Sequence, residues 1–240
     1  MKEHSGSRKL TVLMLVFGIT AFALRKTLYH TAIDAKGLLL RNSPLEIALT
    51  VLTIGVLIRI VLAVRKSENP TEQHSASLPA AFGNVAAGAG ILVTVLTGAP
   101  GMGGYLESAW RILGLAVPVC LLLAGIARAL GKKPFFLLYV VVCLFFLVHI
   151  VARYQLWSGD PQLQDYIFTV LSTMALMFFG FYVAAREADC SNLPMKTGMQ
   201  LAAIYLCLAE LARSSCPALY LGGMLWALTD SDTIQKTETK

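Results

Sequence analysis

One stretch of the chain combines residue types that can bind a ligand or do chemistry. From His149 to Tyr166 the sequence places a histidine, an arginine, aromatic rings, amides and two aspartates between two long apolar runs. His149 and Arg153 are four residues apart, so a helix presents both on one face. An imidazole can act as a general base, and a guanidinium can hold a carboxylate or phosphate. This stretch is therefore the first candidate for binding or catalysis.

The same stretch also fits a structural role at a membrane surface. Tyr154 and Trp157 lie where a helix would leave the hydrocarbon, which is typical of an aromatic belt. Asp160 is a good N-cap, Pro161 suits the first helical position, and Asp165 lies near the positive end of the next helix. A capped helical hairpin is thus the structural alternative to a ligand-binding site.

Further charged residues are expected at the same rim of a helical bundle. Spans that alternate in direction bring the ends of odd-numbered spans and the starts of even-numbered spans to one face. Charges inside spans cost on the order of 2.5 to 3.5 kcal/mol each, so we expect Glu210 to pair with Arg213 or with Arg153. The candidate ligand-binding residues are His149, Arg153, Tyr154, Trp157, Asp160, Asp165, Glu210, Arg213 and Arg111.

Three functional hypotheses fit these residues. The leading one is a membrane protein that binds or transports a small molecule, or serves as the membrane subunit of a larger assembly. The second is an intramembrane enzyme on a lipid-type substrate, with His149 as base and Glu210 as its orienting carboxylate. No HExxH or GxSxG motif supports it, so no catalytic residue is assigned. The third is a scaffold that binds a membrane-protein partner through the small residues Gly83 and Ala87, although packing within the chain is the favoured use of that spacing.

Composition excludes several other classes. The chain is 56% hydrophobic and only 14% charged, far from the balance of a soluble domain. Its net charge of +6 comes from Lys and Arg in short connections between apolar runs, where they set membrane orientation rather than bind nucleic acid. The 5 cysteines show no paired spacing, and acidic clusters are absent. We therefore expect no metal and no cofactor.

The apolar runs predict an all-α polytopic transmembrane helix bundle of about eight spans, with about seven as the alternative. A single transmembrane domain covers residues 1–229, and residues 230–240 form a polar tail. The last apolar stretch is interrupted at Ser214 to Pro217, which favours two short helices over one broken helix. The predicted spans are Leu10–Leu24, Leu45–Val64, Leu78–Thr97, Trp110–Ala127, Pro134–Ala152, Tyr166–Ala185, Thr197–Arg213 and Pro217–Thr229, and an end at Tyr29 is the alternative for the first span. The distribution of Lys and Arg favours a cytoplasmic N-terminus.

Two segments carry a resemblance to known proteins. The residues from Arg153 to Tyr166, and again those from Leu219 to Trp226, resemble a group of uncharacterised multi-pass membrane proteins of clostridial bacteria. The similarity covers mainly the last 90 or so residues. It implies a location in the bacterial inner (plasma) membrane and contact with the lipid bilayer. It implies no activity, and it assigns no catalytic or binding residue.

Overall fold

The computed structural model describes residues 2–31, 43–66, 77–98, 105–157, 166–190 and 192–230. These residues form α-helices joined by short connections, and no strand is found among them. The all-α prediction is thus confirmed. The helices are α1 (Lys2–Thr31), α2 (Pro44–Lys66), α3 (Leu78–Thr97), α4 (Tyr105–Ala129), α5 (Phe136–Trp157), α6 (Ile167–Glu187), α7 (Leu193–Glu210) and α8 (Pro217–Thr229).

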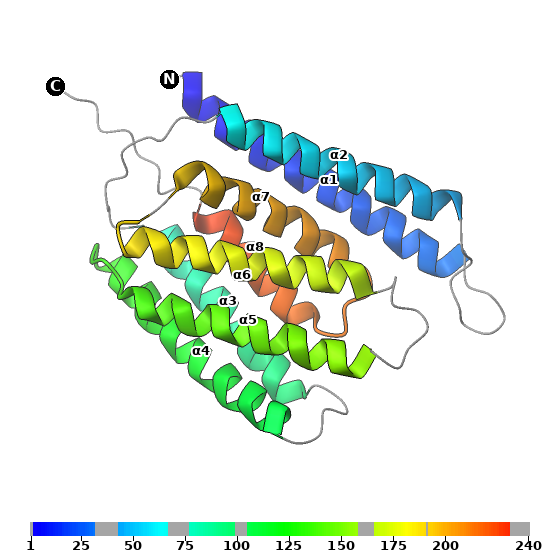
Figure 1. The fold of residues 1–240 in the computed structure, drawn as a ribbon. Coiled ribbons are helices and arrows are strands. Elements are labelled where there is room, and N and C mark those ends of the chain that lie inside the picture. The colour runs from blue at the N-terminus through cyan, green and yellow to red at the C-terminus, as the bar shows by residue number, and fades with distance from the viewer. Residues whose placement is uncertain are drawn as a thin grey trace.

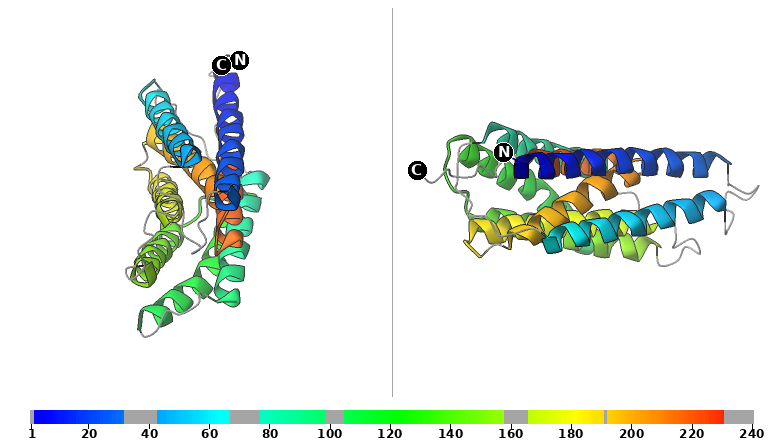
Figure 2. Two further views of the ribbon diagram at one scale, coloured as in Figure 1. Left: turned by 90° about the vertical axis from the view of Figure 1, so that its right-hand side faces the viewer. Right: turned by 90° about the horizontal axis from the view of Figure 1, so that it is seen from above.

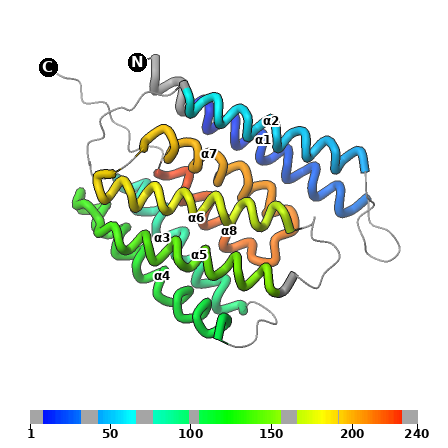
Figure 3. The backbone as a smooth tube through the Cα atoms, in the orientation of Figure 1, coloured from blue at the N-terminus to red at the C-terminus, as the bar shows by residue number. Residues whose placement is uncertain are grey.

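Helix starts follow from local capping chemistry. The Ser77 side chain accepts a hydrogen bond from the backbone N–H of Ala80 at the start of α3, and Asn192 does the same for Met195 at the start of α7. A proline lies in the first turn of both helices and of α8, where its missing N–H costs no helical hydrogen bond. The bounds of α3 and α8 are those predicted. The helical structure is interrupted between α7 and α8, as Figure 3 shows, so the prediction of two helices there is confirmed.

Helix α7 occupies the middle of the bundle. It contacts α1, α2, α6 and α8, and most of its residues are buried. The α1–α2 pair lies on one side of α7, and α3, α4 and α5 lie on the other (Figures 1 and 2). Helices α5 and α7 end, and helices α4, α6 and α8 begin, at the same end of the bundle. We call this end the Arg153 end. The opposite end is the Asp230 end.

Six of the helices are long and apolar enough to cross a membrane, namely those that begin near Lys9 and at Pro44, Leu78, Tyr105, Phe136 and Ile167. The chain is therefore a multi-pass membrane protein. Helices α7 and α8 were predicted as spans but do not belong to this set. Helix α7 carries Lys196, Gln200 and Glu210, and α8 is about 20 Å long at the usual rise per residue, against about 30 Å of hydrocarbon. These two helices are instead the most enclosed part of the bundle.

The small residues of α3 pack inside the chain. A Cβ added at Gly90 would lie 2.3 Å from the carbonyl oxygen of Ala218, and one at Gly222 would lie 2.7 Å from that of Ala86. Such short separations mean that the backbones of α3 and α8 touch. Gly83 and Ala87 are buried in the same chain. This confirms the predicted use of the small-residue spacing within the chain and leaves that face closed to a second copy.

Candidate ligand-binding site

Charged side chains are buried at both ends of the bundle. At the Arg153 end these are Arg25, Arg153 and Glu210, and at the Asp230 end they are Arg128, Arg186, Glu187, Lys196 and Asp230. Of these residues, only Arg153 and Glu210 were predicted from the sequence to belong to a site. A buried charge is costly unless an opposite charge or hydrogen bonds compensate it, so the partners of each group decide what it can do.

His149 lies on α5 and is only 1% exposed. Its Nδ1 accepts a hydrogen bond of 2.9 Å from the indole Nε1 of Trp110 on α4. The rings of Trp110 and Phe145 flank it, with centroids 6.1 and 5.9 Å away. Because Nδ1 is an acceptor, the neutral imidazole carries its proton on Nε2. That Nε2 has no hydrogen-bond partner within the described part of the chain.

Arg153 lies one turn further along α5 and is 4% exposed. Its Nη2 donates to the Sγ of Cys216 at 2.6 Å. Cys216 occupies the N-cap position of α8, so this contact joins the end of α5 to the start of α8. The Nε of Arg153 has no hydrogen-bond partner among the described residues, and none of their carboxylates forms an ion pair with it.

Glu210 pairs with Arg25 of α1 rather than with Arg153. Thr169 on α6 donates a hydrogen bond of 2.6 Å to the Oε1 of Glu210, and Arg25 also donates to the carbonyl of Ala209 at 3.1 Å. The expectation was that Glu210 would pair with Arg213 or with Arg153, and the structure places Arg25 in that position instead. The first predicted span ended at Leu24 or, in the alternative, at Tyr29. Helix α1 continues to Thr31 and brings Arg25 to the end of α7.

The enzyme hypothesis required His149 and Glu210 to act together. In the structure the Nδ1 of His149 is occupied by Trp110, and the Glu210 carboxylate is occupied by Arg25 and Thr169. The base and its orienting carboxylate are therefore not brought into contact. The described residues also contain no group of three or more His, Cys, Asp or Glu that could hold a metal ion.

The remaining predicted residues are placed differently. Arg213 stacks its guanidinium over the ring of Tyr29, 4.1 Å from the centroid. Tyr154 is 59% exposed on α5, as an aromatic belt requires. Trp157 is the last residue of α5. Asp160 and Asp165 lie outside the described residues. Helix α6 begins at Ile167 with Tyr166 in its N-cap position, so Asp160 is not the N-cap of this helix.

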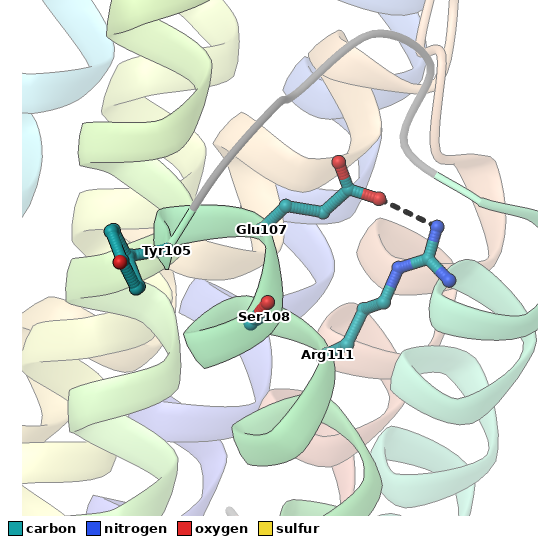
Figure 4. Close-up of a pocket in the computed structure, with 4 residues that line it drawn as sticks. All are labelled: Tyr105, Glu107, Ser108 and Arg111. Carbon is teal, nitrogen blue, oxygen red and sulfur yellow. Dashed lines mark ion pairs between the residues drawn. The ribbon is translucent and has the colours of Figure 1, made fainter.

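Arg111 does not join Arg153. Its side chain is 60% exposed and pairs with Glu107 at 2.6 Å, one turn earlier on α4. Together with Tyr105 and Ser108 this pair lines an open hollow of about 490 Å³ (Figure 4). Trp110, which donates to His149, is buried and directly precedes the exposed Arg111. Because successive residues of a helix point in different directions, the hollow and the surroundings of His149 lie on different sides of α4.

The Asp230 end carries an ion network that was not predicted from the sequence. Arg128 pairs with Glu187 at 3.0 Å and with Asp230, while Lys196 lies 2.6 Å from Asp230 and Arg186 lies 3.9 Å from it. Burial alone would raise the pKa of Asp230, but Lys196, Arg128 and Arg186 lower it below its usual value. The network joins the ends of α4, α6 and α8 to the start of α7.

Four members of this network had been given simpler roles. Arg128, Arg186 and Lys196 were interpreted as residues that set the membrane orientation, and Asp230 was placed at the start of the polar tail. The network could have been predicted from the alternating direction of the spans, which brings these residues to the same end of the bundle. Even-numbered spans end there, so Arg128, Glu187 and Asp230 meet at one rim.

Comparisons of the chain with protein-family models, with curated proteins and with solved structures find no match.

Proposed function

We propose that this multi-pass membrane protein binds a small molecule at the Arg153 end, between α4, α5 and α8. The observation that carries the proposal is the pair of unpartnered polar atoms on neighbouring turns of α5. The Nε2 of His149 and the Nε of Arg153 are both buried, and neither has a partner among the described residues. Buried polar atoms without partners cost about 1 to 3 kcal/mol each, and a bound molecule that pairs with them removes that cost.

The position of these atoms suits a ligand that enters from the membrane rim. Arg153 is about one turn from the end of α5, and His149 lies about one turn deeper. The leading hypothesis has three forms, namely binding alone, transport of the bound molecule, or a role as the membrane subunit of a larger assembly. In each of them we propose that the small molecule binds at this site. We also propose a location in the plasma membrane of a bacterium, which rests on the resemblance of the last 90 or so residues.

The experiment is a thermal-shift screen of the full chain purified in an uncharged detergent. The Tm is measured with a library of small molecules for the wild type and for Arg153→Gln. Arg59→Gln is the matched control, because Arg59 also lies within a span but is exposed. We expect compounds that raise the Tm of the wild type and of Arg59→Gln but leave Arg153→Gln unchanged.

Two results would contradict the proposal. One is a library without any stabilising compound, combined with native mass spectrometry that finds no small molecule on the purified chain. The other is equal stabilisation of all three proteins, which would place binding elsewhere. His149→Gln gives a second test of the same site in case Arg153→Gln does not fold.

A further inference from the structure

The buried cations of this protein differ in how their charge is balanced. The described residues include five buried Lys and Arg side chains, at positions 25, 128, 153, 186 and 196. Arg25 pairs with Glu210, Arg128 pairs with Glu187 and Asp230, and Arg186 and Lys196 both face Asp230. Arg153 is the exception within the described chain, because its one hydrogen bond goes to the thiol of Cys216. Its positive charge is therefore left without a negative partner there.

The unpartnered atoms at this place are both donors. The Nε of arginine always carries a proton, and the Nε2 of His149 carries one because its Nδ1 accepts from Trp110. What is missing at the Arg153 end is consequently an acceptor. His149 and Arg153 are four residues apart on one helix, so a single molecule can accept from both.

A second pair of unpartnered atoms in the bundle has a different character. The Oδ1 of Asn84 and the Nε1 of Trp226 are also buried without partners among the described residues. Both side chains contact Tyr139. Asn84 donates a hydrogen bond of 3.2 Å to its hydroxyl, and the ring of Trp226 stacks on its ring with the two centroids 6.2 Å apart. That pair is one acceptor and one donor on uncharged groups, so it calls for hydrogen bonds but for no compensating charge. Water at the Arg153 end would accept hydrogen bonds but would leave the guanidinium charge uncompensated in a buried position.

We propose that the molecule bound at the Arg153 end carries an anionic group, a carboxylate or a phosphate, that accepts hydrogen bonds from Arg153 and His149. This inference rests on the proposed function and names the class of its ligand. Arg153 supplies the compensating charge and the Nε donor, while the Nε2–H of His149 supplies a second, uncharged donor. The aromatic rings of Trp110 and Phe145 beside His149 supply apolar surface for the rest of the molecule.

The test compares anions with neutral molecules of the same shape. Binding to the full chain in an uncharged detergent is measured by calorimetry for benzoate and benzamide, for decanoate and decanamide, and for inorganic phosphate. We expect the anion of each pair to bind at least about tenfold more tightly than its amide. A charge-assisted hydrogen bond is about twice as strong as a neutral one, and a difference of that size corresponds to about tenfold in affinity. Arg153→Gln is expected to lose this preference, and Arg153→Lys, which keeps the charge but not the planar fork, to retain part of it.

The compounds also identify the source of the anion. Binding of decanoate alone would indicate a lipid-like amphiphile, whereas binding of benzoate and phosphate would indicate a soluble anion, and both results support the inference. Amides that bind as tightly as their acids, with loss of binding in Arg153→Gln, would overturn the anionic class while leaving the proposed function intact. Anion binding that is equal in the wild type, Arg153→Lys and Arg153→Gln would overturn the inference by placing the anion elsewhere.

Discussion

Lys196 and Glu210 lie at opposite ends of α7, and each is buried in an ion pair with a residue of another part of the chain. Lys196 contacts Asp230 after α8, and Glu210 contacts Arg25 on α1. The two pairs are about 21 Å apart along the helix axis. The central helix is thus tied by charge at both ends to the elements that surround it, which explains why it carries charges that a lipid-facing span would not.

The Arg25–Glu210 pair is expected to stabilise the attachment of α1 to α7. Glu210→Gln leaves the guanidinium of Arg25 buried without its counter-ion, so we expect a loss of about 3 kcal/mol in the free energy of unfolding. The measurement is denaturant unfolding in detergent, followed by circular dichroism. Glu107→Gln is the matched control, because it breaks the exposed pair with Arg111 and should cost less than about 0.5 kcal/mol. Equal effects of the two substitutions would show that the buried pair contributes nothing beyond an exposed one.

Asp230 is expected to make the protein sensitive to acid. Its pKa in the folded chain is below its usual value, because the effect of the three cations exceeds that of burial. The folded state therefore binds the proton less readily than the unfolded state. The stabilisation is fully present above the ordinary carboxyl pKa of about 4 and is lost as the pH falls below it toward the folded pKa. We expect the Tm of the wild type to fall more steeply below about pH 4 than that of Asp230→Asn, when both are followed by differential scanning fluorimetry. Parallel curves would contradict this.

The helices were predictable because their signals are local. Hydrophobic run lengths and prolines located every helix, and the prolines at 79 and 217 set the starts of α3 and α8. His149 and Arg153 were correctly placed on one helix near its end, for the same reason. The prediction that α7 and α8 also span the membrane is not confirmed, because these two helices do not meet the length and hydropathy that the other six meet.

The partners of the charged residues could not be predicted in the same way. Arg25 and Glu210 are far apart in sequence, and their contact depends on which helices of the bundle are neighbours. Hydropathy indicates that α1 crosses the membrane but not that it lies against α7 rather than α5. Asp230 likewise looks like the first residue of a polar tail until the end of α8 is placed between Arg128 and Lys196.

The contact between α3 and α8 is expected to tolerate no added volume. Gly222→Val introduces atoms where a Cβ would already lie 2.7 Å from a backbone oxygen, so we expect a destabilisation of at least about 2 kcal/mol. Gly55→Val on α2 is the matched control, because nothing lies within 4 Å of an added Cβ there. Unfolding of both variants in detergent measures the difference. A Gly222→Val chain as stable as Gly55→Val would mean that the backbones of α3 and α8 do not touch.

The orientation of the bundle can be tested with two exposed positions at opposite ends. Cys190 follows α6 at the Asp230 end, and Tyr105 begins α4 at the Arg153 end with a side chain that is 97% exposed. Because Lys and Arg outside the spans favour a cytoplasmic Asp230 end, a chain with Cys190 as its only cysteine should react with a membrane-impermeant maleimide only after the cells are permeabilised. Tyr105→Cys in a cysteine-free chain should react in intact cells. The reverse pattern would invert the orientation, and labelling of both positions from outside would contradict a membrane crossing between them.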